Sequence, residues 1–269
     1  MIPIMLSLFL VPLFWSPVFI NAFVQGKELL FKSIIISTLV IIGVSIVYKK
    51  KLQIRNILKS PLFLLLLFQL YVYALTDFSS NNPLVSTFGT YDRGYGLIME
   101  LFLFAITIYA GLFLNDEKTK TVLKVALISG IIVSLHAILQ KVGINLFFEN
   151  YNLNIFAGRS SGFLGNPSYL GQYAALLVII GGYMAYSERK KTIKYIYLSV
   201  TILLLTTVIL SGTRAAILGL IAALLLIIIK NYRTIFRIIS KWKKTAVLAI
   251  LVLTLALANI PGERFSISE

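Results

Sequence analysis

Long apolar segments alternate with short polar linkers along the whole chain. A helix needs about 20 apolar residues to cross the hydrocarbon core of a membrane, because each residue adds only about 1.5 Å of length. The segments that come close to this length cover about 3–21, 33–48, 61–75, 96–114, 121–141, 168–186, 195–211, 214–230 and 245–260. The pattern predicts an all-α, polytopic integral membrane protein, with about nine transmembrane helices in a single helical domain, 1–269.

The composition of the chain strengthens this prediction and excludes several kinds of site. The 269 residues are 58% hydrophobic and only 13% charged, with a mean hydropathy of +0.90. A soluble domain carries about twice that charged fraction. There is no cysteine and a single histidine. Disulfides and thiolate metal sites are therefore excluded, and no metal or other cofactor is expected.

The distribution of lysine and arginine predicts how the helices are oriented. The linkers 49–60, 115–120, 187–194 and 230–244 together hold 17 of these residues. The alternate linkers hold six, which are Lys27, Lys32, Arg93, Arg159, Arg214 and Arg264. Because basic residues are retained on the cytoplasmic side, we expect the N-terminus inside and Glu269 outside.

The formal charge of +15 could also suggest nucleic-acid binding. The basic residues are spread over four short linkers instead of gathering on one folded face, so no nucleic-acid partner is expected. The first segment, MIPIMLSLFLVPLFWSPVFINAF, lacks the basic start of a signal peptide. It is interpreted as the first span or the remnant of one.

From the third span on, the predicted outer linkers carry arginine and almost no lysine. Arg93 lies in FGTYDRGYG, Arg159 in GRSSGFLGNP, Arg214 in LSGTRAA and Arg264 in PGERFS. The planar guanidinium suits bidentate contact with phosphate or carboxylate, which lysine cannot match. The alternative is that these arginines only extend to the membrane interface and that the glycines only form turns.

The fourth, sixth and eighth predicted helices run from outside to inside, so their N-termini face outward. A helix N-terminus has unpaired N–H groups and a partial positive charge, which favour an anion. Asn166 followed by Pro167 is a typical start for the sixth span, and Ser211 or Thr213 could cap the eighth. Asp92 could play this role for the fourth. The sequence thus predicts that the stretch 158–171 is an ordered outer loop that holds Arg159 above a capped helix.

Two further side chains within the spans carry candidate chemistry. Glu100 lies about one turn inside the fourth span, and an acid at membrane depth is a candidate functional residue. It is a candidate general base, or else the ion-pair partner of Arg93. His136 and Gln140 share one face of the fifth span. A hydrogen bond between helices is a more common role for such a histidine than catalysis.

Three segments resemble the O-antigen ligase and polymerase family of bacterial envelope proteins. They are STFGTYDRGYGLI (86–98), GRSSGFLGNPSYLGQYAALL (158–177) and LSGTRAAILGLIAALLL (210–226). The resemblance implies an all-helical, metal-independent glycosyltransferase in the bacterial inner membrane. Its donor would be a glycan on undecaprenyl diphosphate, and its acceptor lipid A core, another glycan or a protein. Arg159 and Arg214 would bind the diphosphate, with Arg93 as a weaker assignment.

Members of this family have a large outer loop followed by further spans. The sequence stops at PGERFSISE, where that loop is expected to begin, and Arg264 would belong to its start. We therefore expect the chain to represent an N-terminal portion of the family's architecture. Two other functions fit the outer arginines: a polytopic exporter or flippase of lipid-linked saccharides, and a non-catalytic membrane subunit. An exporter should show polar residues at mid-membrane and repeat symmetry between its halves, which the sequence lacks.

Overall fold

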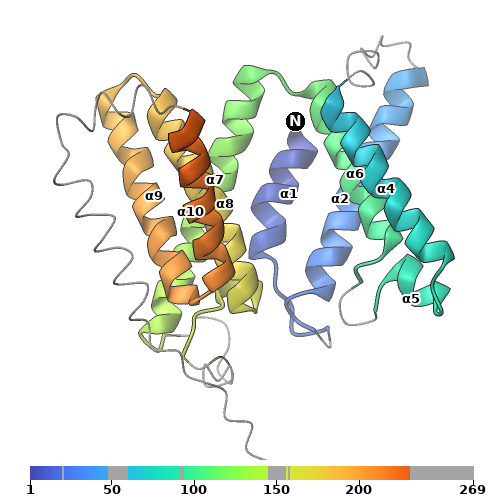
Figure 1. The fold of residues 1–269 in the computed structure, drawn as a ribbon, viewed down its shortest axis with the longest axis horizontal. Helices are drawn as coiled ribbons and strands as arrows, with labels where there is room; N and C mark the ends of the chain where they lie inside the picture. Colours follow the sequence, from blue (N-terminus) through green and yellow to red (C-terminus); the bar gives the residue numbers. More distant parts are fainter. Residues whose placement is uncertain (20, 48–59, 91–93, 145–155, 157, 231–269) are drawn as a thin grey trace, which may run out of the picture. The chain divides into compact units, whose positions relative to one another are not determined.

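The computed structural model describes residues 1–19, 21–47, 60–90, 94–144, 156 and 158–230. These residues form helices joined by turns, with no strand among them. The α-helices are α1 (Ile2–Leu13), α2 (Gln25–Val47), α4 (Pro61–Phe78), α5 (Pro83–Phe88), α6 (Leu97–Phe113), α7 (Asp116–Lys141), α8 (Pro167–Ser187), α9 (Lys191–Ser211) and α10 (Arg214–Lys230). A short 3₁₀ helix, η2, covers Gly162–Leu164. Figure 1 shows their arrangement.

Within the described residues, four helices are long and apolar enough to cross a membrane. They are α4, α7, α8 and α9, whereas α1 and α6 are shorter apolar helices. The all-helical fold and these four helices are those of a membrane protein. The chain divides into two compact units, Met1–Ile217 and Leu218–Glu269, and the contacts described below lie within the first.

Most of these helices begin and end close to the bounds that the apolar segments predict. The bounds of α4, α6, α8, α9 and α10 lie within four residues of the expected ones, and α7 begins five residues earlier than expected. Asn115 caps that earlier start by accepting a hydrogen bond from the Lys118 N–H at 2.9 Å. The ninth expected segment, 245–260, lies outside the described residues.

The first two helices differ more from the expected segments. α1 ends at Leu13, eight residues before the expected end at 21, and Phe14 is extended with φ −68° and ψ 133°. Pro17, which cannot continue a helix, follows shortly after. At about 1.5 Å per residue, α1 is about 18 Å long and too short to cross the hydrocarbon core alone. α2 begins at Gln25, before the expected start at 33. Its first turns contain charged residues, and Glu28 and Lys32 form an ion pair one helical turn apart, which is compatible with a helix there.

The largest cluster of buried apolar residues lies among α7, α8 and α9. Its members are Ala126, Leu127, Leu177, Met184, Ala185, Tyr197 and Leu204. α8 packs along α9, while α7 contacts α1, α8 and α9. Small residues such as Gly130 and Gly181 allow this approach, because a Cβ atom at either position would touch a neighbouring helix.

A second cluster joins α1 to α6 and α7 through Ile4, Tyr109 and Val122. α2 contacts both α1 and α6, and α6 contacts α4. The starts of α2, α6, α8 and α10 and the ends of α7 and α9 lie at one end of this first unit, which is the lower end in Figure 1. Four candidate site residues lie on these helix ends, which are Glu100 at the start of α6, Asn166 before α8, Ser211 at the end of α9 and Arg214 at the start of α10.

Candidate functional site

The stretch 158–166 is bound to the end of α7 by one buried amide side chain. Gln140 is fully buried, and its Oε1 accepts hydrogen bonds from the backbone N–H groups of Ser161 and Gly162, both at 2.9 Å. Its Nε2 donates to Ser161 Oγ at 3.4 Å. The Ser160 hydroxyl donates to the carbonyl oxygen of Ala137 at 2.9 Å, which supplies a partner to the last turn of α7. These bonds define the path of the stretch.

Glycines in this stretch are required by the backbone. Gly162 has φ +54° and Gly165 has φ +71°, a region that other residues rarely adopt. A Cβ atom on Gly165 would also overlap the ring of Phe23, which lies just before α2. The glycines that look like simple turn formers in the sequence therefore also permit close packing against the start of α2.

The expected cap of α8 is present. Asn166 precedes the helix, and its Oδ1 accepts a hydrogen bond from the backbone N–H of Ser168 at 2.8 Å. Pro167 occupies the first helical position, where the missing N–H costs nothing. The start of α8, with the positive end of its dipole, lies directly beyond the stretch that carries Arg159.

The turn between α9 and α10 lies against this same stretch. The Ser160 N–H donates to the carbonyl oxygen of Leu210 at 3.1 Å, and the Thr213 hydroxyl donates to that of Pro167 at 2.9 Å. Ser211 is fully buried and donates to the carbonyl oxygen of Val208 at 2.7 Å. The structure thus joins two of the sequence motifs, 158–171 and 210–214, through backbone and hydroxyl hydrogen bonds.

The Arg159 side chain lies against this turn. Its aliphatic stem covers Gly212, where a Cβ atom would come within 2.8 Å of Arg159 Cδ. Its Nε donates to the carbonyl oxygen of Phe156 at 3.3 Å. Arg214 is exposed at the start of α10, two residues beyond Gly212. Among the residues that the structure describes, neither guanidinium pairs with a carboxylate, so both can accept an anionic ligand.

Glu100 lies elsewhere, in the first turn of α6, and is buried. Its carboxylate accepts hydrogen bonds from the Tyr95 hydroxyl and from Gln69 Nε2 of α4, the latter at 3.3 Å. The hydrogen bond to Glu100, together with burial and the negative charge, raises the pKa of Tyr95. In the described part of the chain, no hydrogen bond or ion pair joins Glu100 to Arg159 or Arg214. Arg93 and Arg264 lie outside the described residues, so the pairing of Glu100 with Arg93 stays a prediction.

Sequence reasoning missed Lys27, near the start of α2. Its Nζ donates to the carbonyl oxygen of Phe163 at 2.5 Å and lies 5.8 Å from the centroid of the Phe23 ring. Lys27 precedes the apolar part of α2, and burial lowers its pKa to about 7. The signal in the sequence was weak: a lysine on the outer side, where the later linkers carry arginine.

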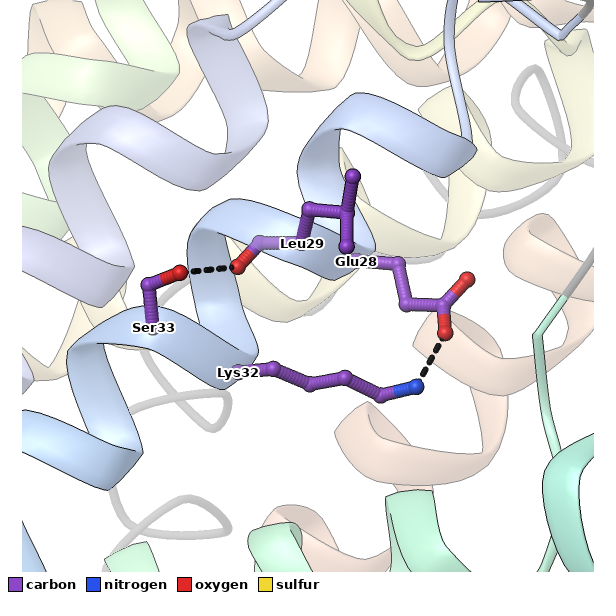
Figure 2. Close-up of polar contacts among 4 residues, drawn as sticks. All are labelled: Glu28, Leu29, Lys32 and Ser33. Atoms are coloured by element: carbon purple, nitrogen blue, oxygen red, sulfur yellow. Dashed lines mark hydrogen bonds and ion pairs between the residues drawn. The ribbon is translucent and has the colours of Figure 1, made fainter.

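The next residue, Glu28, points to a different partner. Its carboxylate forms an ion pair with Lys32, one helical turn further along α2 (Figure 2). The same carboxylate lies against Gly94, where a Cβ atom would overlap it. The start of α2 therefore contacts both the stretch 158–166, through Lys27, and the segment before α6, through Glu28.

A large apolar cavity opens between α1, α2 and α6. Its volume is about 910 Å³, and Lys27, Glu28 and Tyr95 line it together with Leu164 and Tyr169. A smaller cavity of about 120 Å³ lies beside it, lined by Gln69, Glu100 and again Tyr95. Tyr95 thus lines both cavities and donates a hydrogen bond to the buried acid.

His136 is buried on α7, with its ring 4.3 Å from that of Phe163 and tilted by 37°. It therefore packs against the stretch 158–166 beside Gln140. In the described ranges, no three histidine, aspartate or glutamate side chains come together to hold a metal ion. Comparisons of the chain with protein-family models, with curated proteins and with solved structures found no match.

Proposed function

We propose that this protein transfers a glycan from an undecaprenyl-diphosphate carrier to an acceptor on the outer face of the bacterial inner membrane. The acceptor would be lipid A core, another glycan or a protein. The proposal includes about nine spans with the N-terminus inside. It rests on the sequence resemblance, and one observation of the structure carries it further. Arg159 lies over the turn that leads to Arg214, beside the capped start of α8.

The arginines would catalyse this transfer mainly by electrostatic stabilisation of the leaving diphosphate. An acceptor hydroxyl oxygen forms a bond to the anomeric carbon of the glycan, and the bond from that carbon to the diphosphate oxygen breaks. The electron pair leaves with the diphosphate, whose growing negative charge Arg159 and Arg214 would stabilise. Asn166 caps the start of α8, whereas Ser211 binds the end of α9 and accepts from the Thr213 N–H, so both would fix the backbone around this anion. Bidentate guanidinium contacts suit such a leaving group.

The acceptor hydroxyl must also lose a proton. Glu100 is the candidate base within the described residues, because it is a buried carboxylate at the same end of the helices. Tyr95 and Gln69 already donate to it, so it has to act from a hydrogen-bonded network. Replacing Glu100 by Gln separates its two roles. If Glu100 is the base, this variant should lose glycan transfer but retain donor binding. If Glu100 is the ion-pair partner of Arg93, donor binding should weaken as well.

Binding of undecaprenyl diphosphate to the purified protein tests the diphosphate site directly. Native mass spectrometry would compare the wild type with Arg159→Ala and Arg214→Ala. Losing one charged hydrogen-bonding partner should weaken binding about tenfold to a hundredfold, corresponding to about 1.5–3 kcal/mol. Arg189→Ala is the matched control, because Arg189 is an exposed arginine in the linker between α8 and α9.

The outcomes separate the alternatives. Binding that depends on both arginines, followed by glycan transfer in a reconstituted assay, supports the transferase. Binding of the donor without transfer favours an exporter or flippase. If the wild type does not bind, or if all variants bind equally well, the proposed diphosphate site is wrong and a non-catalytic subunit becomes the better interpretation.

A further inference from the structure

The cavity between α1, α2 and α6 has the form of a site for a long apolar chain. It follows α6 from Met99 to Ala110, about 16 Å of helix at 1.5 Å per residue. Its walls include Ile4, Leu8 and Phe31, and its volume of about 910 Å³ lies at the upper end of the range for ligand pockets. A cavity with such walls does not hold ordered water well, because water needs polar partners.

The charged groups of this cavity gather at one end. Lys27, Glu28 and Tyr95 lie at the starts of α2 and α6, whereas Ile4 and Ala110 lie toward the opposite end. Glu28 is neutralised by its ion pair with Lys32 (Figure 2). Lys27 pairs with no carboxylate in the described part of the chain and uses one donor on the Phe163 carbonyl. An ammonium group has three donors, so two remain for a ligand.

We propose that this cavity binds a membrane lipid that has one aliphatic chain and an anionic phosphate head. The chain would lie along α6, and the head would accept hydrogen bonds from Lys27. When Lys27 is protonated, the Lys27, Glu28 and Lys32 group carries a net positive charge, which complements such a head. This site is separate from the Arg159 and Arg214 site, and the inference does not rest on glycan transfer.

Lipid bound here would act on the stretch 158–166. Lys27 holds the Phe163 carbonyl, Leu164 lines the cavity, and Gly165 packs on Phe23. These three residues follow Arg159 closely in the sequence. An occupied cavity would therefore support the path of the stretch from the side of α2, while Gln140 supports it from α7.

The test uses dodecyl phosphate as the probe and the whole chain in nanodiscs of zwitterionic lipid, with binding followed by native mass spectrometry. Dodecanol tests the contribution of the head, and inorganic phosphate tests whether a free anion suffices. We expect dodecyl phosphate to bind at least tenfold more tightly than dodecanol, because the charged hydrogen bond is lost in the alcohol. Inorganic phosphate should not displace the probe.

Two pairs of variants locate the site. Lys27→Met should weaken binding of dodecyl phosphate about tenfold or more, whereas Lys118→Met should not, although Lys118 also donates to a backbone carbonyl, that of Phe113. Met99→Trp should fill the cavity and reduce binding of both probes. Leu101→Trp is its control, because Leu101 is exposed on the same helix.

Three results would overturn the inference. They are no binding of dodecyl phosphate by the wild type, equal binding by the Lys27 and Met99 variants, and displacement by inorganic phosphate alone. If a variant fails to fold, the comparison of dodecyl phosphate, dodecanol and inorganic phosphate on the wild type still tests the inference. Because none of these measurements involves a glycan donor, dodecyl phosphate binding with no undecaprenyl diphosphate binding would leave this inference standing and overturn the proposed function.

Discussion

α8 and α4 are both long apolar helices, yet they occupy different places in the protein. α4 is the more hydropathic of the two, but no residue of its span is buried, whereas 44% of the α8 span is buried. α8 carries Gly171, Ala174, Ala175 and Gly181, while α4 presents mainly leucine and phenylalanine. In a membrane, lipid is as apolar as leucine, so hydropathy does not decide which helix is buried. Small residues do, because they let backbones approach.

The same contrast holds for the polar side chains at the helix ends. Around α8, the stretch 158–166 is held by Gln140 and the turn at Gly212 through several backbone hydrogen bonds. Around α4 and α6, Glu100 has two side-chain partners next to a cavity. The α8 region is therefore built for rigid positioning, whereas the α4 and α6 region leaves room beside its charged groups.

The largest expected effect comes from the buried Gln140, which is compared with the exposed Gln69 of the other region. Gln140→Leu leaves the N–H groups of Ser161 and Gly162 without their acceptor, which should cost about 1–3 kcal/mol for each group. Gln69→Leu removes one 3.3 Å hydrogen bond from an exposed side chain and should cost less than about 1 kcal/mol. The measurement is the free energy of unfolding in mixed micelles. Equal losses in the two variants would contradict the contrast drawn between the regions.

Adjacent glycines in α8 offer a test of close packing. A Cβ atom on Gly181 would lie 2.5 Å from Thr201 Oγ1 of α9, whereas one on Gly182 has no neighbour within 4 Å. We expect Gly181→Val to lower the free energy of unfolding by about 1–3 kcal/mol through overpacking. Gly182→Val should be close to neutral and serves as the control. If both changes are tolerated, α8 and α9 do not pack as closely as described.

A third expected effect is a pH dependence that arises from Lys27. Its pKa is lowered by burial from 10.5 to about 7 in the folded protein. Between pH 7 and 10.5 the unfolded state therefore binds more protons than the folded state, so stability rises with pH across this window. The slope is at most about 1.4 kcal/mol per pH unit. Below pH 7 the group is charged in both states and its contribution is constant.

Comparison of the wild type with Lys27→Met isolates that contribution from other titrating groups. Glu28, Lys32 and Tyr95 lie nearby and remain in both proteins. The difference in unfolding free energy between the two proteins should change by up to a few kcal/mol from pH 7 to pH 10. A difference that stays constant with pH would show that Lys27 is not buried as the structure places it.

The sequence by itself determined the class of protein, the helical segments between 61 and 230 and the cap at Asn166. These features depend on residues close together in the chain, through apolar runs, capping side chains and proline, so local patterns reveal them. The first two helices differed from the prediction because the backbone of α1 becomes extended at Phe14, and because paired charges were compatible with an earlier start for α2.

Only the tertiary structure decided which side chains meet. Gln140 holds Ser161, Arg159 covers Gly212, and Lys27 reaches Phe163 across 136 positions of sequence. The cavity beside α6 likewise results from how three helices are spaced. Such contacts follow from the fit of small and large residues between helices. In an apolar solvent that fit leaves little trace in the hydropathy pattern of any one segment, because lipid-facing and buried positions are equally apolar.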